Sequence, residues 1–303
     1  MEPVSPSALP GEIDWDLFWS DPPPPLSYLV EPLLPVGRVV TVHADAKVGK
    51  TLIGWDIGLQ SATGGTMWGQ DLVPIEVLYV DEEMSHADVA RLLEAYGFGP
   101  DSDLSRFHYC LRSGWPPFDT AAGGQMLLEK GKHSRARLVV IDTQSKVLEG
   151  LENDASTMTN FFKYTLGPLK DLGVTVLIFD HSGKDKRRGA RGSSAKPADA
   201  DMTWSLEKRG MTGKLRLTLT HSRLHLEQST LDLQRQSTPL RHELITVDGT
   251  YEEAIDTLVT WLQNNDIDIS RSKRDIYKIM RDKGLKFRND RMSEAIDLVK
   301  DDV

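Results

Sequence analysis

The sequence has little cysteine and no long apolar run, and each absence excludes a class of protein. Cys110 is the one cysteine among 303 residues, so an intrachain disulfide is excluded and a reducing compartment is expected. No apolar stretch approaches the ~18–20 residues of a membrane-spanning helix. The N-terminus also lacks the basic-then-apolar pattern of a signal peptide. These features predict a cytoplasmic protein without membrane contact.

Net positive charge is the second feature that is missing. The formal net charge is −9 and the pI is about 5.4, which argues against a protein that coats nucleic acid over its whole surface. Any contact with nucleic acid should therefore be local. The hydrophobic content of 39% and charged content of 27% are ordinary for a globular chain. The length predicts about two domains.

Changes in composition divide the chain into three parts. Residues 1–27 form a proline-rich strap, with consecutive prolines at 22–25, that cannot build its own core. Within it, Trp15, Phe18 and Trp19 have the i, i+3, i+4 spacing of one helical turn. That turn is expected to pack either on its own domain or on another subunit. Residues 28–248 alternate apolar strands with helices, and residues 250–303 read as short helices.

A phosphate-binding loop is the first recognisable motif. A β-branched run at 38–42 predicts a buried strand and residues 52–61 predict a helix, with Gly49-Lys50-Thr51 between them. Backbone N–H groups of such a loop and of the helix N-terminus can bind phosphates. The pattern G-x-x-x-x-G-K-[ST] begins here with Ala44 instead of glycine. The residues expected to bind nucleotide are Ala46, Lys47, Val48, Gly49, Lys50, Thr51 and Leu52.

Acidic residues follow two further strands. A strand at 75–80 ends in Asp81-Glu82-Glu83, before a helix at 87–96 whose Ser85 begins a capping box. One of these acids could orient the attacking water, although acids are also favoured at any helix N-terminus. A strand at 138–142 ends in Asp142, the Walker B pattern. The sequence thus predicts Mg²⁺ between Thr51 and Asp142.

The remaining elements of the α/β part are predicted from periodicity. A β-branched run at 174–179 predicts a central strand that ends before His181. This histidine either senses the γ-phosphate or bonds to the backbone. A helix over 156–172, kinked at Pro168, should bury an apolar face. Further predictions are strands at 106–111, 202–206, 215–219 and 243–247, a helix at 125–132 after a Gly-Gly break, and a loop at 228–238. The apolar face comprises Met158, Phe161, Phe162, Thr165, Leu166, Leu169 and Leu172.

Two segments reverse the overall negative charge. Residues 184–196 hold six basic residues and one acid, which fits single-strand backbone contact, an arginine reaching a neighbour's γ-phosphate, or a plain solvated loop. Residues 271–291 hold nine Lys or Arg against three Asp, a net +6. Three helices are expected in the C-terminal part that contains this segment, at 251–263, after a Ser270 cap, and at 290–299. This plan fits a DNA-binding helix-turn-helix or a protein-docking module.

As an ordered set, these motifs resemble RecA-fold ATPases of the RepA and DnaB helicase type. The chain is most similar to phage and plasmid AAA-family proteins with a RepA-like ATPase, over about residues 28 to 225. The resemblance rests on Gly49-Lys50-Thr51, residues 77–85 and 138–142, His181-Ser-Gly-Lys184 and Arg191-Gly-Ser-Ser-Ala195. It implies a RecA-like P-loop fold with a mostly parallel central sheet, followed by the small helical domain. A bacterial host cytoplasm is implied if the gene is phage-encoded.

The resemblance also implies roles for individual residues. Glu83 corresponds to the catalytic glutamate, with Glu82 as its substitute, and His181 to the γ-phosphate sensor. In this superfamily an arginine acts in trans across a ring of subunits, such as a hexamer. Arg191 begins the Arg-Gly-Ser-Ser-Ala segment and Arg223 lies near where DnaB-type proteins carry theirs, and the sequence does not decide between them.

Two functional hypotheses follow. The first is a Mg²⁺- and ATP-dependent, ring-forming ATPase that acts on DNA as a replicative helicase or translocase. It would contact single-stranded DNA through residues 184–196 and 271–291. The second is an ATP-gated adaptor, a helicase loader or DNA-binding regulator without unwinding activity, favoured by the compact chain. A metabolic P-loop kinase is disfavoured because kinases need neither the Arg191 segment nor a basic C-terminal module.

Overall fold

The computed structural model describes residues 13–22, 24–151, 154–181, 200–210, 213–224, 229–245, 251–265, 267–283 and 289–301. It consists of two compact units, Met1–Leu244 and Ile245–Val303.

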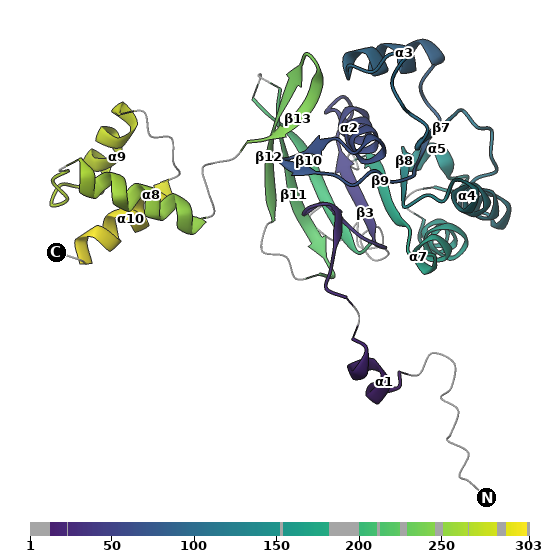
Figure 1. The fold of residues 1–303 in the computed structure, drawn as a ribbon, viewed down its shortest axis with the longest axis horizontal. Coiled ribbons are helices and arrows are strands. Elements are labelled where there is room, and N and C mark those ends of the chain that lie inside the picture. Colours follow the sequence, from purple (N-terminus) through teal and green to yellow (C-terminus); the bar gives the residue numbers. More distant parts are fainter. Residues whose placement is uncertain are drawn as a thin grey trace, which may run out of the picture. The chain divides into compact units, whose positions relative to one another are not determined.

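The first unit is built on a nine-stranded sheet with the order β13-β12-β11-β10-β3-β9-β8-β6-β7 (Figure 1). Neighbouring strands from β10 to β7 run parallel, whereas β10 to β13 pair antiparallel. This mixed α/β architecture fits the RecA-like P-loop fold that the motifs imply. The strands are β3 (Val39–Ala44), β6 (Val77–Asp81), β7 (Phe107–Leu111), β8 (Leu138–Asp142), β9 (Thr175–His181), β10 (Met202–Arg209), β11 (Lys214–Ser222), β12 (Thr230–Ser237) and β13 (Leu240–Leu244).

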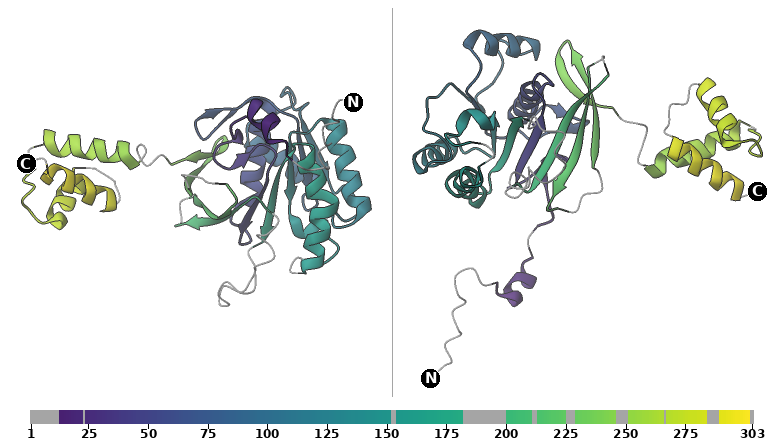
Figure 2. Two further views of the ribbon diagram at one scale, coloured as in Figure 1. Left: turned by 90° about the horizontal axis from the view of Figure 1, so that it is seen from below. Right: turned by 180° about the vertical axis from the view of Figure 1, so that it is seen from behind.

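Helices cover both faces of the sheet, because the central strands are apolar on both sides. Val40 and Val42 of β3 join a core with α2, whereas Val39 joins the core on the other face. Figures 1 and 2 show α4 and α7 side by side, on the opposite side of the sheet from α2. The helices are α2 (Lys50–Thr63), α3 (His86–Ala95), α4 (Ala121–Ser134), α5 (Gln144–Val147), α6 (Ala155–Phe161), the π-helical turn η1 (Phe162–Leu166) and α7 (Gly167–Asp171).

The N-terminal strap forms a short helix, α1 (Trp15–Ser20), that Asp14 caps. Trp15 is 59% exposed and Trp19 is 70% exposed, and no residue of α1 is buried. The described part of the chain therefore does not bury this turn on its own domain. Two small hairpins complete the unit: β1 (Tyr28–Val30) with β2 (Leu34–Pro35), and β4 (Thr66–Met67) with β5 (Gln70–Asp71).

The largest correction to the sequence-based elements is β12, because a loop was expected over 228–238. Leu231 and Leu233 are buried and alternate with polar residues that face the other side. Arg216 of β11 binds the Asp232 carboxylate through Nε at 2.6 Å. Two leucines are too few to give a clear period-2 pattern, so the strand was missed. The last strand, β13, also begins earlier than predicted, at Leu240 instead of residue 243.

Two predicted features of the helical layer are also wrong. The single helix expected over 156–172 is divided into α6, the π-helical turn η1 and α7, and Leu172 is 48% exposed instead of buried. Gly123 and Gly124 do not precede a helix but lie inside α4. A Cβ on Gly123 would lie 2.0 Å from the Pro117 carbonyl oxygen. These glycines therefore allow close packing and do not break the helix.

The second unit has its own apolar core. Its helices are α8 (Tyr251–Asn264), α9 (Lys273–Asp282) and α10 (Asn289–Asp301). The cap of α9 is Ser272 and not Ser270, since the Ser272 hydroxyl accepts the Asp275 N–H at 3.3 Å. Lys273 binds Asp297 at 2.5 Å and Arg271 lies 3.5 Å from Asp268, so part of the positive charge is paired. The core comprises Ile255, Leu258, Leu262, Ile276, Met280, Met292, Ala295, Ile296 and Val299.

Two glycines on the same face of α4 predict opposite effects of alanine. A Cβ on Gly124 would lie 2.1 Å from the Tyr164 carbonyl oxygen, whereas a Cβ on Gly131 meets only Leu169 Cδ2 at 3.8 Å. Gly124→Ala should lower the free energy of unfolding by about 1–3 kcal/mol through overpacking. Gly131→Ala should raise it by up to about 1 kcal/mol through helix propensity. Urea denaturation followed by circular dichroism measures both, and equal midpoints for the two variants would contradict this packing.

Candidate functional site

The turn between β3 and α2 has the geometry of an anion-binding loop. Gly49 has φ 123°, a conformation that is open to glycine and strained for other residues. It is the N-cap of α2, and no side chain caps the first N–H groups of that helix. Ala46 and Lys47 are exposed at the tip of the turn, and Val48 is buried under it. Free N–H groups at the start of a long helix are suited to phosphate oxygens.

Lys50 extends back over this turn. Its Nζ donates to the Ala44 carbonyl at 2.9 Å and lies 3.0 Å from His181 Nδ1, at the end of β9. Ala44, which replaces the first glycine of the motif, is itself buried at the end of β3. Burial lowers the pKa of Lys50, and nearby carboxylates, first of all that of Asp142, partly offset this effect. The ammonium therefore lies at the edge where the parallel strands end.

Asp142 is the most perturbed carboxylate of the site. It is 4% exposed at the end of β8, and Tyr79 donates its hydroxyl to Asp142 Oδ2 at 2.9 Å. Burial raises the pKa of Asp142 to about 6, although hydrogen bonds from Thr51 and Tyr79 act in the opposite direction. A bound cation would favour its ionised form, so the residue fits a divalent-metal site next to the Thr51 hydroxyl.

The three acids at the end of β6, Asp81, Glu82 and Glu83, have three different environments. Asp81 is buried and accepts the backbone N–H groups of Glu83 at 2.7 Å and Met84 at 3.0 Å, so it fixes the turn. Glu82 accepts both the N–H and the hydroxyl of Ser113, at 3.0 and 2.6 Å. The Glu83 side chain is 49% exposed and lies 3.8 Å from Lys146 Nζ. Of the three, Glu83 has the carboxylate that is least constrained by hydrogen bonds.

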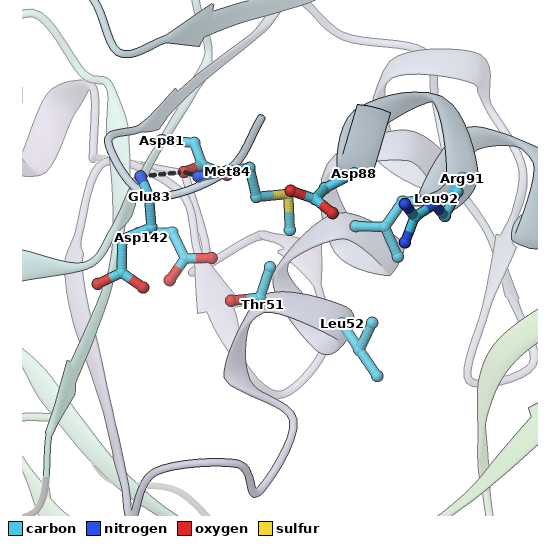
Figure 3. Close-up of a pocket in the computed structure, with 9 residues that line it drawn as sticks. All are labelled: Thr51, Leu52, Asp81, Glu83, Met84, Asp88, Arg91, Leu92 and Asp142. Carbon is cyan, nitrogen blue, oxygen red and sulfur yellow. Dashed lines mark hydrogen bonds between the residues drawn. The ribbon is translucent and has the colours of Figure 1, made fainter. Parts of the chain in front are cut away.

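A cavity of about 500 Å³ lies over these groups. Figure 3 shows the carboxylates of Glu83 and Asp142 next to the Thr51 hydroxyl, with α3 on the far side. Register explains the convergence: Asp81 pairs with Asp142, and Ala44 pairs with His181, so these strand ends share one edge of the sheet. The cavity is lined by Thr51, Leu52, Asp81, Glu83, Met84, Asp88, Arg91, Leu92 and Asp142.

The candidate arginines are not part of this convergence. Arg191 and the basic segment 184–196 lie outside the described residues. Arg223 follows β11, and its N–H donates to the Asp201 carbonyl at 2.8 Å. Ser222 pairs with Met202, which pairs with Val40 at the start of β3. Arg223 therefore lies at the edge of the sheet opposite to the phosphate-binding turn of its own chain.

Several residues near the site were not expected there from the sequence. Leu206 pairs with Ala44, so the end of β10 and the start of β11 extend past the strand end that carries the phosphate-binding turn. Arg209 and Lys214 lie in this extension, and Arg209 is 3.5 Å from Glu207.

Tyr79 was also not expected near the site from the sequence. A tyrosine within an apolar strand is a usable signal, because a buried hydroxyl needs a hydrogen-bond partner. The contact between Glu82 and Ser113 joins residues far apart in sequence and gives no such signal.

The fold and the site together define a P-loop nucleoside triphosphatase. A family model described as an AAA domain matches residues 3–187, more than half of the chain. The chain therefore belongs to the AAA-domain family of P-loop ATPases, and nucleotide binding and hydrolysis are the general activity of that family. No curated protein matches the sequence. Among the helices in the described ranges, none has the length and apolar character to span a membrane.

Because the pKa of Asp142 is raised, its ionised carboxylate should lower the free energy of unfolding, and the size of this effect should depend on pH. Because the folded-state pKa of about 6 lies above the ordinary aspartate pKa of 3.8, the stability that the protonated group contributes is lost as the pH rises through 6. Asp142→Asn should therefore stabilise the nucleotide-free protein by up to about 3 kcal/mol at pH 7.5, and by about half as much at pH 5.

Thermal unfolding at the two pH values measures this difference. Asp171→Asn, at an exposed carboxylate, is the matched control and should change neither midpoint. A destabilised Asp142→Asn at pH 7.5 would contradict the electrostatic description of the site.

Proposed function

We propose that the protein couples Mg²⁺-dependent ATP hydrolysis to action on DNA as a ring-forming helicase or translocase of the RepA and DnaB type. The observation that carries the hydrolytic part is the convergence of Thr51, Glu83 and Asp142 on one cavity at the ends of parallel strands. The Lys50 ammonium lies close enough to interact with the charges of both carboxylates. In open α/β sheets, ligands bind at this edge. The DNA-directed part rests on the ordered motifs and on the two basic segments of the sequence.

The side chains have distinct roles in this proposal. Backbone N–H groups of residues 46–52 bind the β- and γ-phosphates, and Lys50 neutralises their charge. Glu83 aligns the attacking water in line with the γ-phosphate. His181 would register the presence of the γ-phosphate, and the distance of 3.0 Å from its Nδ1 to Lys50 Nζ supports this role.

Thr51 and Asp142 are the residues that would hold Mg²⁺. Across the described residues, no group of three or more His, Cys, Asp or Glu side chains converges to hold a metal by itself. This fits Mg²⁺, which proteins bind with one or two side chains together with phosphates and water. The ion would neutralise charge that develops on the transferred phosphoryl group.

Glu83 and its neighbour form a matched pair for testing the hydrolytic step. Glu83→Gln should reduce ATP turnover by roughly 10²–10⁴-fold, the usual contribution of a positioned base, and leave ATP binding intact. Glu82→Gln should keep turnover within about twofold, because Ser113 holds that carboxylate away from the reaction. Phosphate release and fluorescent-nucleotide binding measure the two effects. Equal losses in both variants would remove Glu83 from this role.

A residue from a second subunit completes the proposed site. Arg191 and Arg223 are the sequence-based candidates, and Arg209 joins them because β10 extends past the phosphate-binding edge. Exposed Trp15 and Trp19 of α1 favour a further contact between subunits. Mixing Glu83→Gln chains with chains that carry alanine at one arginine tests this. Recovered turnover in the mixture identifies the arginine that acts in trans, and no recovery with any of the three contradicts shared sites.

An ATP-gated adaptor is the alternative function. The observation that favours it is the second unit, in which α8, α9 and α10 share an apolar core separate from those of the ATPase unit. In such an adaptor, nucleotide sets the assembly state and the helical unit binds DNA or a helicase. The unit also fits a helix-turn-helix module, with the basic residues of 271–291 contacting phosphates.

Turnover with and without single-stranded DNA separates the two functions. A motor should show DNA-stimulated phosphate release and strand displacement, and it should keep the stimulation after deletion of residues 250–303. An adaptor should hydrolyse ATP without displacement and lose partner binding on the same deletion. Absence of both DNA stimulation and strand displacement in the full chain would contradict the motor.

A further inference from the structure

The last strand of the ATPase unit, β13, makes a buried polar contact with the phosphate-binding helix. His242 donates its backbone N–H to Asp56 Oδ2 at 2.6 Å, and its Nδ1 lies 2.9 Å from the same oxygen. Both side chains are fully buried. A buried carboxylate is costly unless it is hydrogen-bonded. The register that brings His242 opposite Asp56 gives Asp56 Oδ2 two partners, whereas the buried Oδ1 has no hydrogen-bond partner among the described residues. Loss of this register would leave the whole carboxylate unpaired, so the pair holds β13 against α2.

The neighbouring residue of β13 reaches the second helix that borders the cavity. Arg241 Cζ lies 5.6 Å from the ring centroid of Tyr96 and 5.9 Å from that of Phe98. Tyr96 ends α3, stacks on Trp55 of α2, and donates its hydroxyl to the Leu52 carbonyl. Burial, and then the charge of Asp56, raise the pKa of Tyr96, whereas Arg241 lowers it. The tyrosine hydroxyl therefore remains a donor to the first turn of α2.

These contacts lie directly behind the nucleotide cavity. Leu52 and Leu92 line the cavity from α2 and α3, and the Tyr96 N–H bonds to the Leu92 carbonyl. The distance between the two helices at this point is set by Tyr96. Gly97, which follows Tyr96, lies close to the turn that leads into β13. A Cβ on Gly97 would lie 3.6 Å from Pro239 Cβ in that turn. Strand β13 thus supports both sides of the cavity.

We propose that β13 is a positioning element for the nucleotide site, in which His242 acts through Asp56 and Arg241 acts through Tyr96. This inference rests on the proposed binding of ATP in the cavity. Leu244, the last residue of β13, is followed directly by the second unit at Ile245. The effect of a ligand bound to that unit, or of a force applied to it, would therefore be transmitted to the nucleotide site through this strand. Coupling of this kind is reciprocal, so nucleotide must in turn stabilise β13.

Hydrogen–deuterium exchange of the full chain tests the coupling. The magnesium complex of a non-hydrolysable ATP analogue should protect residues 49–56, where it binds, and residues 240–244, which it does not touch. Protection of neither segment means that nucleotide does not bind and the proposed function fails. Protection of residues 49–56 alone overturns the inference and leaves the proposed function standing.

An isosteric variant supplies the second measurement. Tyr96→Phe removes only the hydroxyl that bonds to Leu52, keeps both ring contacts, and should weaken binding of the analogue by roughly three- to tenfold. It should also reduce protection of residues 240–244. Tyr164→Phe, on the helical layer across the sheet, is the matched control and should change neither. Unchanged affinity and protection in Tyr96→Phe would overturn the inference.

Discussion

The burial of one ammonium group at the edge of the sheet is the constraint on which the site depends. Lys50 is 7% exposed, and burial lowers its pKa, so an uncompensated charge there would be costly. Compensation comes from the Ala44 carbonyl and from carboxylates on other strands, of which Asp142 has the largest effect. Parallel register is what brings these strand ends together, and the sheet order fixes which residues meet. The carboxylates around Lys50 add to the negative charge of any polyanion that binds there. Lys50 and a cation would have to balance both.

Similar carboxylates at this edge of the sheet therefore have different environments, because their hydrogen bonds differ. Asp81 accepts two backbone N–H groups at Oδ1 and the Tyr109 hydroxyl at Oδ2. Glu82 accepts hydrogen bonds from Ser113, and Asp142 is buried beside Tyr79. Glu83 keeps a half-exposed carboxylate facing the cavity. A buried acid with a raised pKa suits cation binding, whereas an acid with free lone pairs suits the alignment of water. The stability cost of Asp142 is thus the counterpart of a functional site.

The sequence is informative where the physics is local. Strands β3, β8 and β9 are apolar on both faces and read as continuous β-branched runs, and the loop between β3 and α2 carries its own signature. The AAA-domain match supports the general assignment, and the RepA and DnaB resemblance stays a prediction. Strand β12 was missed because its pattern depends on two leucines and on pairing with β11. Contacts such as Asp56 with His242, which are 186 residues apart, exist only in the folded chain and have no local signal.

Phosphate release by the full-length chain in ATP and magnesium chloride, compared with Lys50→Ala, tests the central claim most directly. The wild-type chain should hydrolyse ATP, and Lys50→Ala should fold, as judged by circular dichroism, yet release no phosphate above background. Hydrolysis by Lys50→Ala at the wild-type rate, or a folded wild-type chain that neither binds nor hydrolyses ATP, would contradict the assignment of this edge of the sheet as the catalytic site.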